Sequence, residues 1–147
     1  MTQQEILDYN KRCAEFIKLK TNQYDQYLLP MRDTWYGGNS YSEWADSDGY
    51  IDNSIYEGYE ERCWALDLGN LIFHSDWNWI MRVKEAIQRN FYFMDILGCG
   101  ICQIKGIEGK TKNPHVSVAS DEPKEAVVQA INNFLIWYNN ESSNKNN

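Results

Sequence analysis

Cys99 and Cys102 form a C-x-x-C pair, a spacing that redox and zinc sites use because it brings two sulfurs to one centre. A thioredoxin-like pair leads into a helix, whereas this pair lies in a β-strand pattern. Alternate residues of a strand face opposite ways, so the two sulfurs should point to opposite faces. A structural zinc would need two further ligands. The other Cys and His residues are scattered along the chain: Cys13, Cys63, His74 and His115. We therefore expect free thiols, as in a reducing compartment, with no metal and no cofactor.

Two loops resemble ligand sites without completing them. Gly106–Thr111 ends like a phosphate-binding P-loop, but Ile104 stands where the first glycine belongs, and a strand pattern follows instead of a helix. Asp46–Asp52 resembles the middle of a calcium-binding EF-hand loop, but Trp44 and Ile55 occupy its first and last ligand positions. A hairpin loop and an Asp-Gly turn are the simpler interpretations.

The loop that contains this segment, Lys105–Pro114, nevertheless concentrates positive charge in an acidic protein. Its lysines are Lys105, Lys110 and Lys112. A local anion site is therefore an alternative to a solvated hairpin loop.

The sequence contains few residues in the patterns that catalytic sites use. His74 and His115 are the only histidines, and the sequence has no G-x-S-x-G or H-E-x-x-H motif. We name no catalytic residue, because no nucleophile can be paired with a base from the sequence. Whether the protein is an enzyme is therefore uncertain from the sequence, and a non-catalytic protein is favoured.

Aromatic rings are unusually abundant, with 6 Trp and 10 Tyr in the chain. Many lie in residues 21–71, where Gly, Asn, Ser and Asp interrupt any helical period. A disordered linker rarely carries so many rings, so we expect an ordered insertion with short strands or turns and a short helix near Ser54–Arg62. The candidate binding rings of this insertion are Trp35, Tyr36, Trp44 and Tyr50.

Composition and charge exclude several classes of protein. The 147 residues include 14 basic and 21 acidic ones, for a formal charge of −7, and 43% are hydrophobic. That hydrophobic fraction excludes a fully disordered chain, and the acidity argues against a general nucleic-acid coat. The chain has no apolar run of about 18 residues. Its first residues also lack the basic segment followed by an apolar stretch that is typical of a secretory signal peptide. We therefore expect no membrane span, no secretory signal and a cytoplasmic location.

Hydrophobic periodicity predicts helices on both sides of the insertion. A capping box at Thr2 predicts a first helix over Gln3–Leu19. A second helix begins with Ser75 as its N-cap, followed by an acidic residue in the first turn. Its apolar stripe leaves Trp77 and Trp79 on opposite flanks, so these two rings cannot both be central core residues.

Three short β runs follow the second helix: Phe91–Leu97, Cys99–Ile104 and His115–Ala119. A last helix begins at a cap on Ser120 or Asp121 and ends before a polar tail, residues 140–147. In this helix Ile136 points away from the buried stripe, which suggests a second contact surface and allows a homodimer. An antiparallel sheet with both helices on one face would bury the apolar stripes.

These elements define an α+β fold: helix, three-stranded antiparallel sheet and helix, with an N-terminal helix and an aromatic-rich insertion. We expect one domain over 1–139, in which 1–20 is the N-terminal helix, 21–71 the insertion and 72–139 the α-β-β-β-α unit. The order of that unit is the order of the double-stranded RNA-binding domain, and Lys124–Ala126 resembles the start of its second helix.

The first turn of the last helix is acidic, so the similar order of elements does not imply binding to RNA. In the RNA-binding domain this helix presents several lysines to phosphates across the grooves. Here the turn contains Asp121, Glu122 and Glu125, which would repel a nucleic-acid backbone. We carry over the topology and do not expect binding to nucleic acid.

Two segments carry a resemblance. Phe73–Met81 has the sequence F-H-S-D-W-N-W-I-M, and Phe134–Asn139 has the sequence F-L-I-W-Y-N. They resemble the F-H-S-D-W-N-W-L-M core and the F-I-K-W-Y-N C-terminal helix of a widespread family of small uncharacterised proteins of bacteria and their phages. The resemblance spans Leu71–Asn139 and brings no activity with it. Its phage association implies an accessory or anti-defence role.

The leading hypothesis is a non-catalytic binding protein of phage or mobile-element type that docks on a host protein and blocks it. Aromatic side chains serve as interaction anchors, and acidity favours basic, nucleic-acid-binding partners. The first alternative is sequestration of a nucleotide-like signalling molecule, stacked on aromatic rings while lysines and a helix N-terminus take the phosphate. A small enzyme or a metal-binding protein is the second alternative. The candidate binding residues outside the insertion are His74, Trp77, Trp79, Lys105, Lys110 and Lys112.

Overall fold

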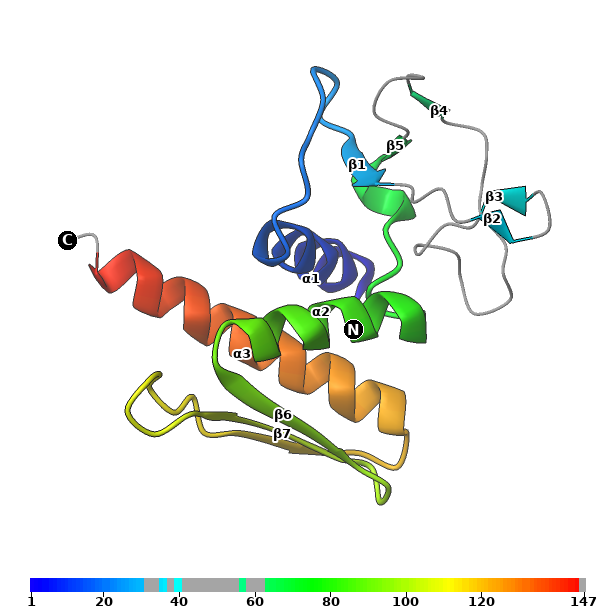
Figure 1. Ribbon diagram of the computed structural model, residues 1–147. Helices are drawn as coiled ribbons and strands as arrows, with labels where there is room; N and C mark the ends of the chain where they lie inside the picture. Colours follow the sequence, from blue (N-terminus) through cyan, green and yellow to red (C-terminus); the bar gives the residue numbers. More distant parts are fainter. Residues whose placement is uncertain (31–34, 37–38, 41–55, 58–62, 146–147) are drawn as a thin grey trace. The chain divides into compact units, whose positions relative to one another are not determined.

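A computed structural model describes residues 1–30, 35–36, 39–40, 56–57 and 63–145 (Figure 1). The fold is α+β, as predicted, with three α-helices and antiparallel sheets among the described residues. The chain divides into two compact units, Met1–Ile80 and Met81–Asn147. The boundary falls inside helix α2, Trp77–Arg89, whereas the sequence pattern assigns this whole helix to the C-terminal unit.

Helix α1 of the first unit spans Gln3–Phe16 and begins at the predicted capping box. The Glu5 backbone N–H donates to Thr2 Oγ1 at 3.2 Å, and the Glu5 carboxylate accepts from the Thr2 backbone N–H. The helix ends three residues before the predicted end at Leu19. Lys18 adopts a left-handed backbone with φ of 61°, and the Leu19 backbone N–H returns to the Ala14 carbonyl at 3.0 Å. This closing motif satisfies the last carbonyls of the helix and turns the chain away.

Short antiparallel strands follow α1, as predicted for the insertion. The strands are β1 Tyr27–Pro30, β2 Trp35–Tyr36, β3 Asn39–Ser40, β4 Tyr56–Glu57 and β5 Cys63–Leu66. Strand β5 lies between β1 and β4, and β2 pairs with β3. The predicted helix over Ser54–Arg62 is wrong at Tyr56–Glu57, because that backbone pairs with Trp64 and Cys63 of β5. A short 3-10 helix, Leu68–Asn70, leads to the segment before α2.

The second unit contains a three-stranded antiparallel sheet in the order β6-β7-β8. The strands are β6 Tyr92–Leu97, β7 Ile101–Gly106 and β8 Val116–Ala119. They confirm the three predicted β runs to within two residues at each end. Helix α3 spans Pro123–Lys145 and packs against β7 and β8. The helix includes most of the predicted polar tail, since it continues through Lys145.

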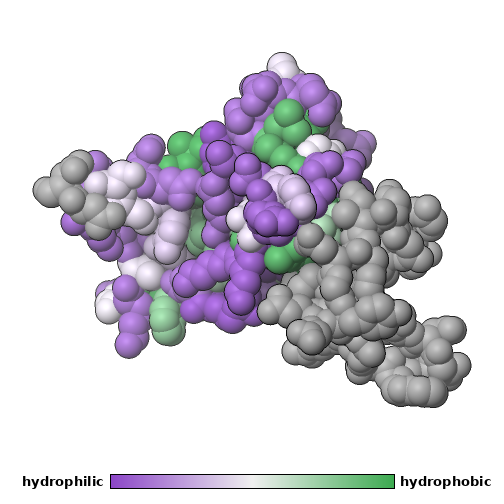
Figure 2. All heavy atoms as spheres, turned by 90° about the horizontal axis from the view of Figure 1, so that it is seen from above, coloured by the Kyte–Doolittle hydropathy of each residue, from purple (hydrophilic) through white to green (hydrophobic). Residues whose placement is uncertain are grey.

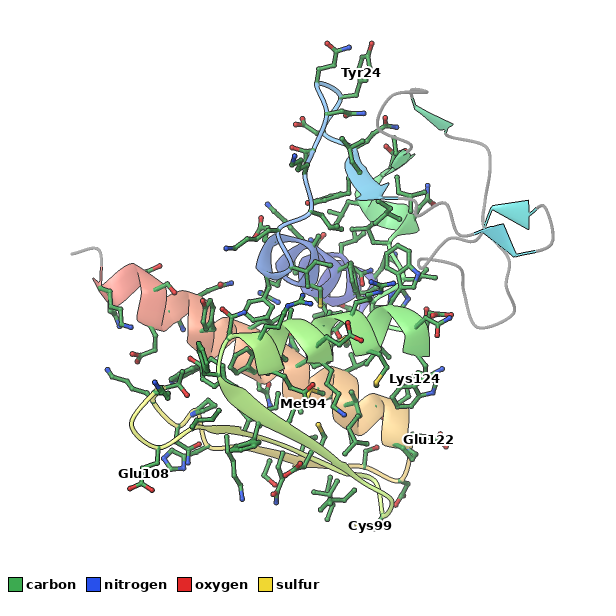
Figure 3. All side chains as sticks on the ribbon, in the orientation of Figure 1. Tyr24, Met94, Cys99, Glu108, Glu122 and Lys124 are labelled. Carbon is green, nitrogen blue, oxygen red and sulfur yellow. The ribbon has the colours of Figure 1, made fainter. Side chains whose placement is uncertain are left out.

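One face of this sheet forms the core of the second unit together with α3. Tyr92, Met94, Cys102, Ile104 and Val116 are buried on that face. The Tyr92 ring meets the Phe134 ring of α3 edge-on, with centroids 4.8 Å apart. Figure 3 labels Met94 within this core and Cys99 at the turn between β6 and β7. None of the described helices combines the length and apolar character that a membrane crossing requires.

Candidate functional site

The segment before α2, which contains the F-H-S-D-W-N-W motif, is built mainly from structural contacts. Asp76 is the N-cap of α2: its Oδ1 accepts from the backbone N–H of Asn78 at 2.8 Å and from that of Trp79 at 3.4 Å. The predicted cap at Ser75 is therefore wrong by one residue, because the longer reach of the buried Asp76 side chain satisfies the first amides of the helix.

Phe73 and Trp79 belong to the interior of the first unit. Phe73 is fully buried and Trp79 is only 3% exposed, and their rings meet edge-on with centroids 4.9 Å apart. The hydroxyl of Tyr9 in α1 donates to the Phe73 carbonyl at 3.3 Å. Trp79 is thus a packing residue and does not present its ring to a ligand. Trp77 is half-buried, so the two tryptophans differ in burial as their positions on the helix predict.

His74 is held by Asn10, a polar side chain that α1 buries to 1% exposure. Asn10 Nδ2 donates to the Leu71 carbonyl at 2.8 Å and lies 3.1 Å from His74 Nδ1. An amide nitrogen only donates, so in this contact His74 Nδ1 accepts, as it does in the tautomer protonated at Nε2. Asn10 Oδ1 lies 3.4 Å from the same nitrogen and would accept from a protonated Nδ1. Burial lowers the pKa of His74, which favours the neutral ring that this contact requires. The arrangement ties the segment before α2 to α1 and leaves His74 half-buried.

The sheet of the second unit presents a different kind of surface on the side opposite α3. Phe93 is 56% exposed and Leu97 is 43% exposed, although both lie in β6, the strand that also carries the buried Tyr92 and Met94. The strand register places Leu97 opposite Ile101, and Ile101 opposite Ala119 of β8. We call the Leu97, Ile101 and Ala119 row the apolar end of the outer sheet face.

The other end of the same face is basic and aromatic. Phe93 lies directly opposite Lys105, whose side chain is exposed. The loop after β7 carries Lys110 and Lys112, both exposed, and a hydrogen bond from Thr111 ties it to Phe91, which is also 56% exposed. We call Phe93 and Lys105 on this face, together with Phe91, Lys110 and Lys112 at its edge, the basic end.

The remaining predicted site residues lie elsewhere. The backbones of Trp35 and Tyr36 form strand β2, opposite Ser40 and Asn39. Trp44 and Tyr50 lie outside the described residues, as does the Asp46–Asp52 segment that resembles a calcium loop.

The two cysteines are separated as predicted, although Cys99 lies in the turn before β7 and not in the strand. Cys99 is exposed at the β6–β7 turn and Cys102 is buried on the α3 side of the sheet, and both are free thiols. Cys13 is likewise free and buried in α1. Within the residues that the structure describes, no group of three or more His, Cys, Asp or Glu side chains is arranged to hold a metal ion.

Sequence reasoning missed three residues of the outer face: Phe93, Leu97 and Ile101. A signal for them exists, because β6 is apolar at nearly every position and a strand covered on one face only must then expose apolar side chains. Ile136 of α3 is 39% exposed, as predicted, but Trp137 beside it packs on Tyr92, with ring centroids 6.1 Å apart. Figure 2 shows one face of the molecule, on which hydrophilic residues predominate among those described and hydrophobic ones form small separate areas.

Comparisons with protein-family models, with curated protein sequences and with solved structures found no match to this chain.

Proposed function

We propose that this chain is a non-catalytic binding protein, an accessory protein of a phage or mobile element, that docks on a host protein and blocks it. The observation that carries the proposal is the apolar end of the outer sheet face. Leu97 and Ile101 lie side by side there, with Ala119 completing the row. Covering a large apolar side chain stabilises a complex by roughly 1.5–3 kcal/mol, so this row can anchor an interface.

The distribution of charge supports a basic partner. Residues 1–80 contain 6 Lys and Arg against 14 Asp and Glu, a formal charge of −8. Residues 81–147 contain 8 against 7, a formal charge of +1. The formal charge of −7 for the whole chain attracts basic proteins and speeds their encounter, although the lysines of the basic end oppose this locally. A host protein that itself binds nucleic acid has this character.

The phage and anti-defence part of the proposal depends on the resemblance of Phe73–Met81 and Phe134–Asn139 to proteins of bacteria and their phages. A phage-encoded chain of this kind would act in the cytoplasm of the host cell. The partner is then a host protein rather than a component of the virion.

Site-specific photo-crosslinking tests the proposal. Benzoylphenylalanine is placed at Leu97, in the apolar end, and in a matched protein at Asn133, an exposed position of α3. We expect one basic host protein to be crosslinked from position 97 and not from position 133, and the crosslink to disappear when Ile101→Ser is added. A crosslink to a second copy of the chain would replace host docking by a homodimer. Equal products from both positions, or none from position 97, would overturn the proposal.

A further inference from the structure

We infer that the basic end of the outer sheet face binds a nucleotide, a nucleobase joined to phosphate. The site consists of Phe91, Phe93, Lys105, Lys110 and Lys112. It shares no residue with the apolar end, so this inference can fail while protein docking holds, and the reverse.

The aromatic part of the site is the Phe93 ring next to a lysine. Phe93 and Lys105 are directly opposite each other in the antiparallel register, and both are exposed on the same face. Side chains opposite each other in a sheet are about 5 Å apart at Cβ, within reach of one ligand. An exposed ring offers a π-face on which any base can stack, and an adjacent ammonium can meet the phosphate of the same nucleotide.

The lysine loop is tied to the backbone of Phe91, the second exposed aromatic residue. The Thr111 hydroxyl donates to the Phe91 carbonyl at 2.6 Å and accepts from the Ile107 backbone N–H at 2.8 Å. The Lys110 backbone N–H closes a turn on the Ile107 carbonyl at 2.9 Å. These bonds fix the backbone that carries Lys110 and Lys112 beside Phe91, so the loop is ordered before a ligand arrives.

Three carboxylates oppose an anion at or next to this site. Asp95 is exposed on the same face, two residues after Phe93 in β6 and opposite Gln103. Lys112 Nζ lies 3.2 Å from Glu141 Oε2 of α3, although the Lys112 side chain is 73% exposed. Glu108 lies in the loop itself and is labelled in Figure 3. An exposed pair of this kind contributes little, so a phosphate can replace Glu141 at Lys112. The three lysines are matched by these three carboxylates, but the second unit as a whole lacks the strong negative charge of the first.

A free nucleotide and a single strand of nucleic acid share this chemistry, and the test distinguishes them. Binding of a fluorescein-labelled ten-nucleotide oligothymidylate to the full chain is followed by anisotropy at low salt, with ATP and inorganic phosphate as competitors. Displacement by ATP at concentrations where phosphate has no effect assigns the site to free nucleotides. Binding that ATP does not displace assigns it to a strand. No binding, or equal displacement by phosphate and ATP, would overturn the inference.

Substitutions that change charge test whether the lysines favour nucleotide binding and the carboxylates oppose it. We expect Lys105→Gln with Lys110→Gln to weaken binding about tenfold or more, and to reduce the slope of log K against log salt by about 0.7 for each phosphate that is no longer neutralised. Glu141→Gln should strengthen binding severalfold, because Lys112 is released. Lys145→Gln, which removes the same charge at an exposed position near the end of α3, should change binding less than twofold. An equal effect of Lys145→Gln would show nonspecific attraction and contradict the site.

A ring variant separates stacking from charge. Phe93→Leu keeps an apolar side chain at this exposed position but removes the π-face, and it should weaken nucleotide binding about fivefold or more. Leu97→Ala, at the apolar end, is the matched control and should leave nucleotide binding unchanged. Thermal unfolding of both variants checks that the sheet is intact. Binding by Phe93→Leu that equals the parent protein would exclude base stacking on this ring.

Discussion

The two faces of the β6-β7-β8 sheet are made from the same strands and from similar residues, yet they have different roles. Tyr92 and Met94 of β6 are buried in the core with α3, whereas Phe93 and Leu97 of the same strand are exposed. Residue type does not distinguish the two sets, because all four side chains are large and apolar. The presence of a covering helix distinguishes them: α3 buries one face, and apolar side chains stay exposed on the other.

Thiol chemistry should show the largest difference between covered and exposed positions. Burial raises the pKa of Cys102 to about 11, so only about one thiol in a thousand is ionised at pH 8. Alkylation of Cys102 should therefore be at least roughly a hundredfold slower than that of Cys99 at the exposed turn. A time course with iodoacetamide, read by peptide mass mapping, measures both rates in one sample. Comparable rates would show that α3 does not protect the inner face.

Alanine substitutions at two isoleucines of β7, one on each face of the sheet, test how much each face contributes to stability. Ile104 is fully buried on the inner face, and Ile101 is half-buried on the outer face. Ile104→Ala should lower the free energy of unfolding by about 2–5 kcal/mol, because it opens a cavity under α3. Ile101→Ala should cost less than about 1 kcal/mol, because less of its side chain is buried. Urea denaturation of both variants gives the comparison, and equal decreases would contradict the assignment of faces.

This contrast also explains how much of the fold and of the candidate site can be predicted from the sequence. Capping residues and alternation predict the helix, three strands and helix of the second unit, because those signals are local. They do not show which face of β6 is covered, because nearly every position of that strand is apolar and either alternation fits. The cluster of lysines in and beside the loop is visible in the sequence itself and indicates a local anion site. The position of Phe93 opposite Lys105 is not predicted, because it depends on the strand register. The link from the loop to the Phe91 backbone is not predicted either, because it depends on the Thr111 hydrogen bond.

The two glycine turns at opposite ends of the sheet extend the comparison to the backbone. Gly100 and Gly109 both have positive φ, 80° and 78°. A Cβ at Gly100 would collide with the Ser120 carbonyl oxygen, whereas a Cβ at Gly109 would meet no described atom within 4 Å. Gly109→Ala should cost about 1 kcal/mol for the left-handed backbone alone, and Gly100→Ala about 3 kcal/mol, because the chain must also move. Thermal unfolding measures both, and similar decreases would mean that the turn before β7 yields without strain.

The smallest effect is expected from pH, and it belongs to the first unit rather than to the sheet. Burial holds the pKa of His74 below its usual value of about 6.5. Above pH 6.5 the ring is neutral in both the folded and the unfolded chain, so the full stability is present. As the pH falls below 6.5 the unfolded chain takes up the proton first, and the free energy of unfolding decreases until the folded pKa is passed. The decrease should be on the order of tenths of a kcal/mol, since His74 is only half-buried and solvent screens the charge.

Asn10 gives this pH dependence a structural cause that a variant can test. Protonation of His74 at Nδ1 turns the acceptor of the Asn10 amide into a donor, so two donors then face each other across 3.1 Å. Unfolding in urea at pH 7 and pH 5 should show a smaller difference for His74→Gln than for the parent chain, and the imidazole of the parent should titrate by NMR with a midpoint below 6.5. A midpoint at or above that value would mean that the contact favours the charged ring. The buried Asn10 would then hold His74 through its Oδ1, which lies 3.4 Å from Nδ1, and the pair would strengthen as the pH falls.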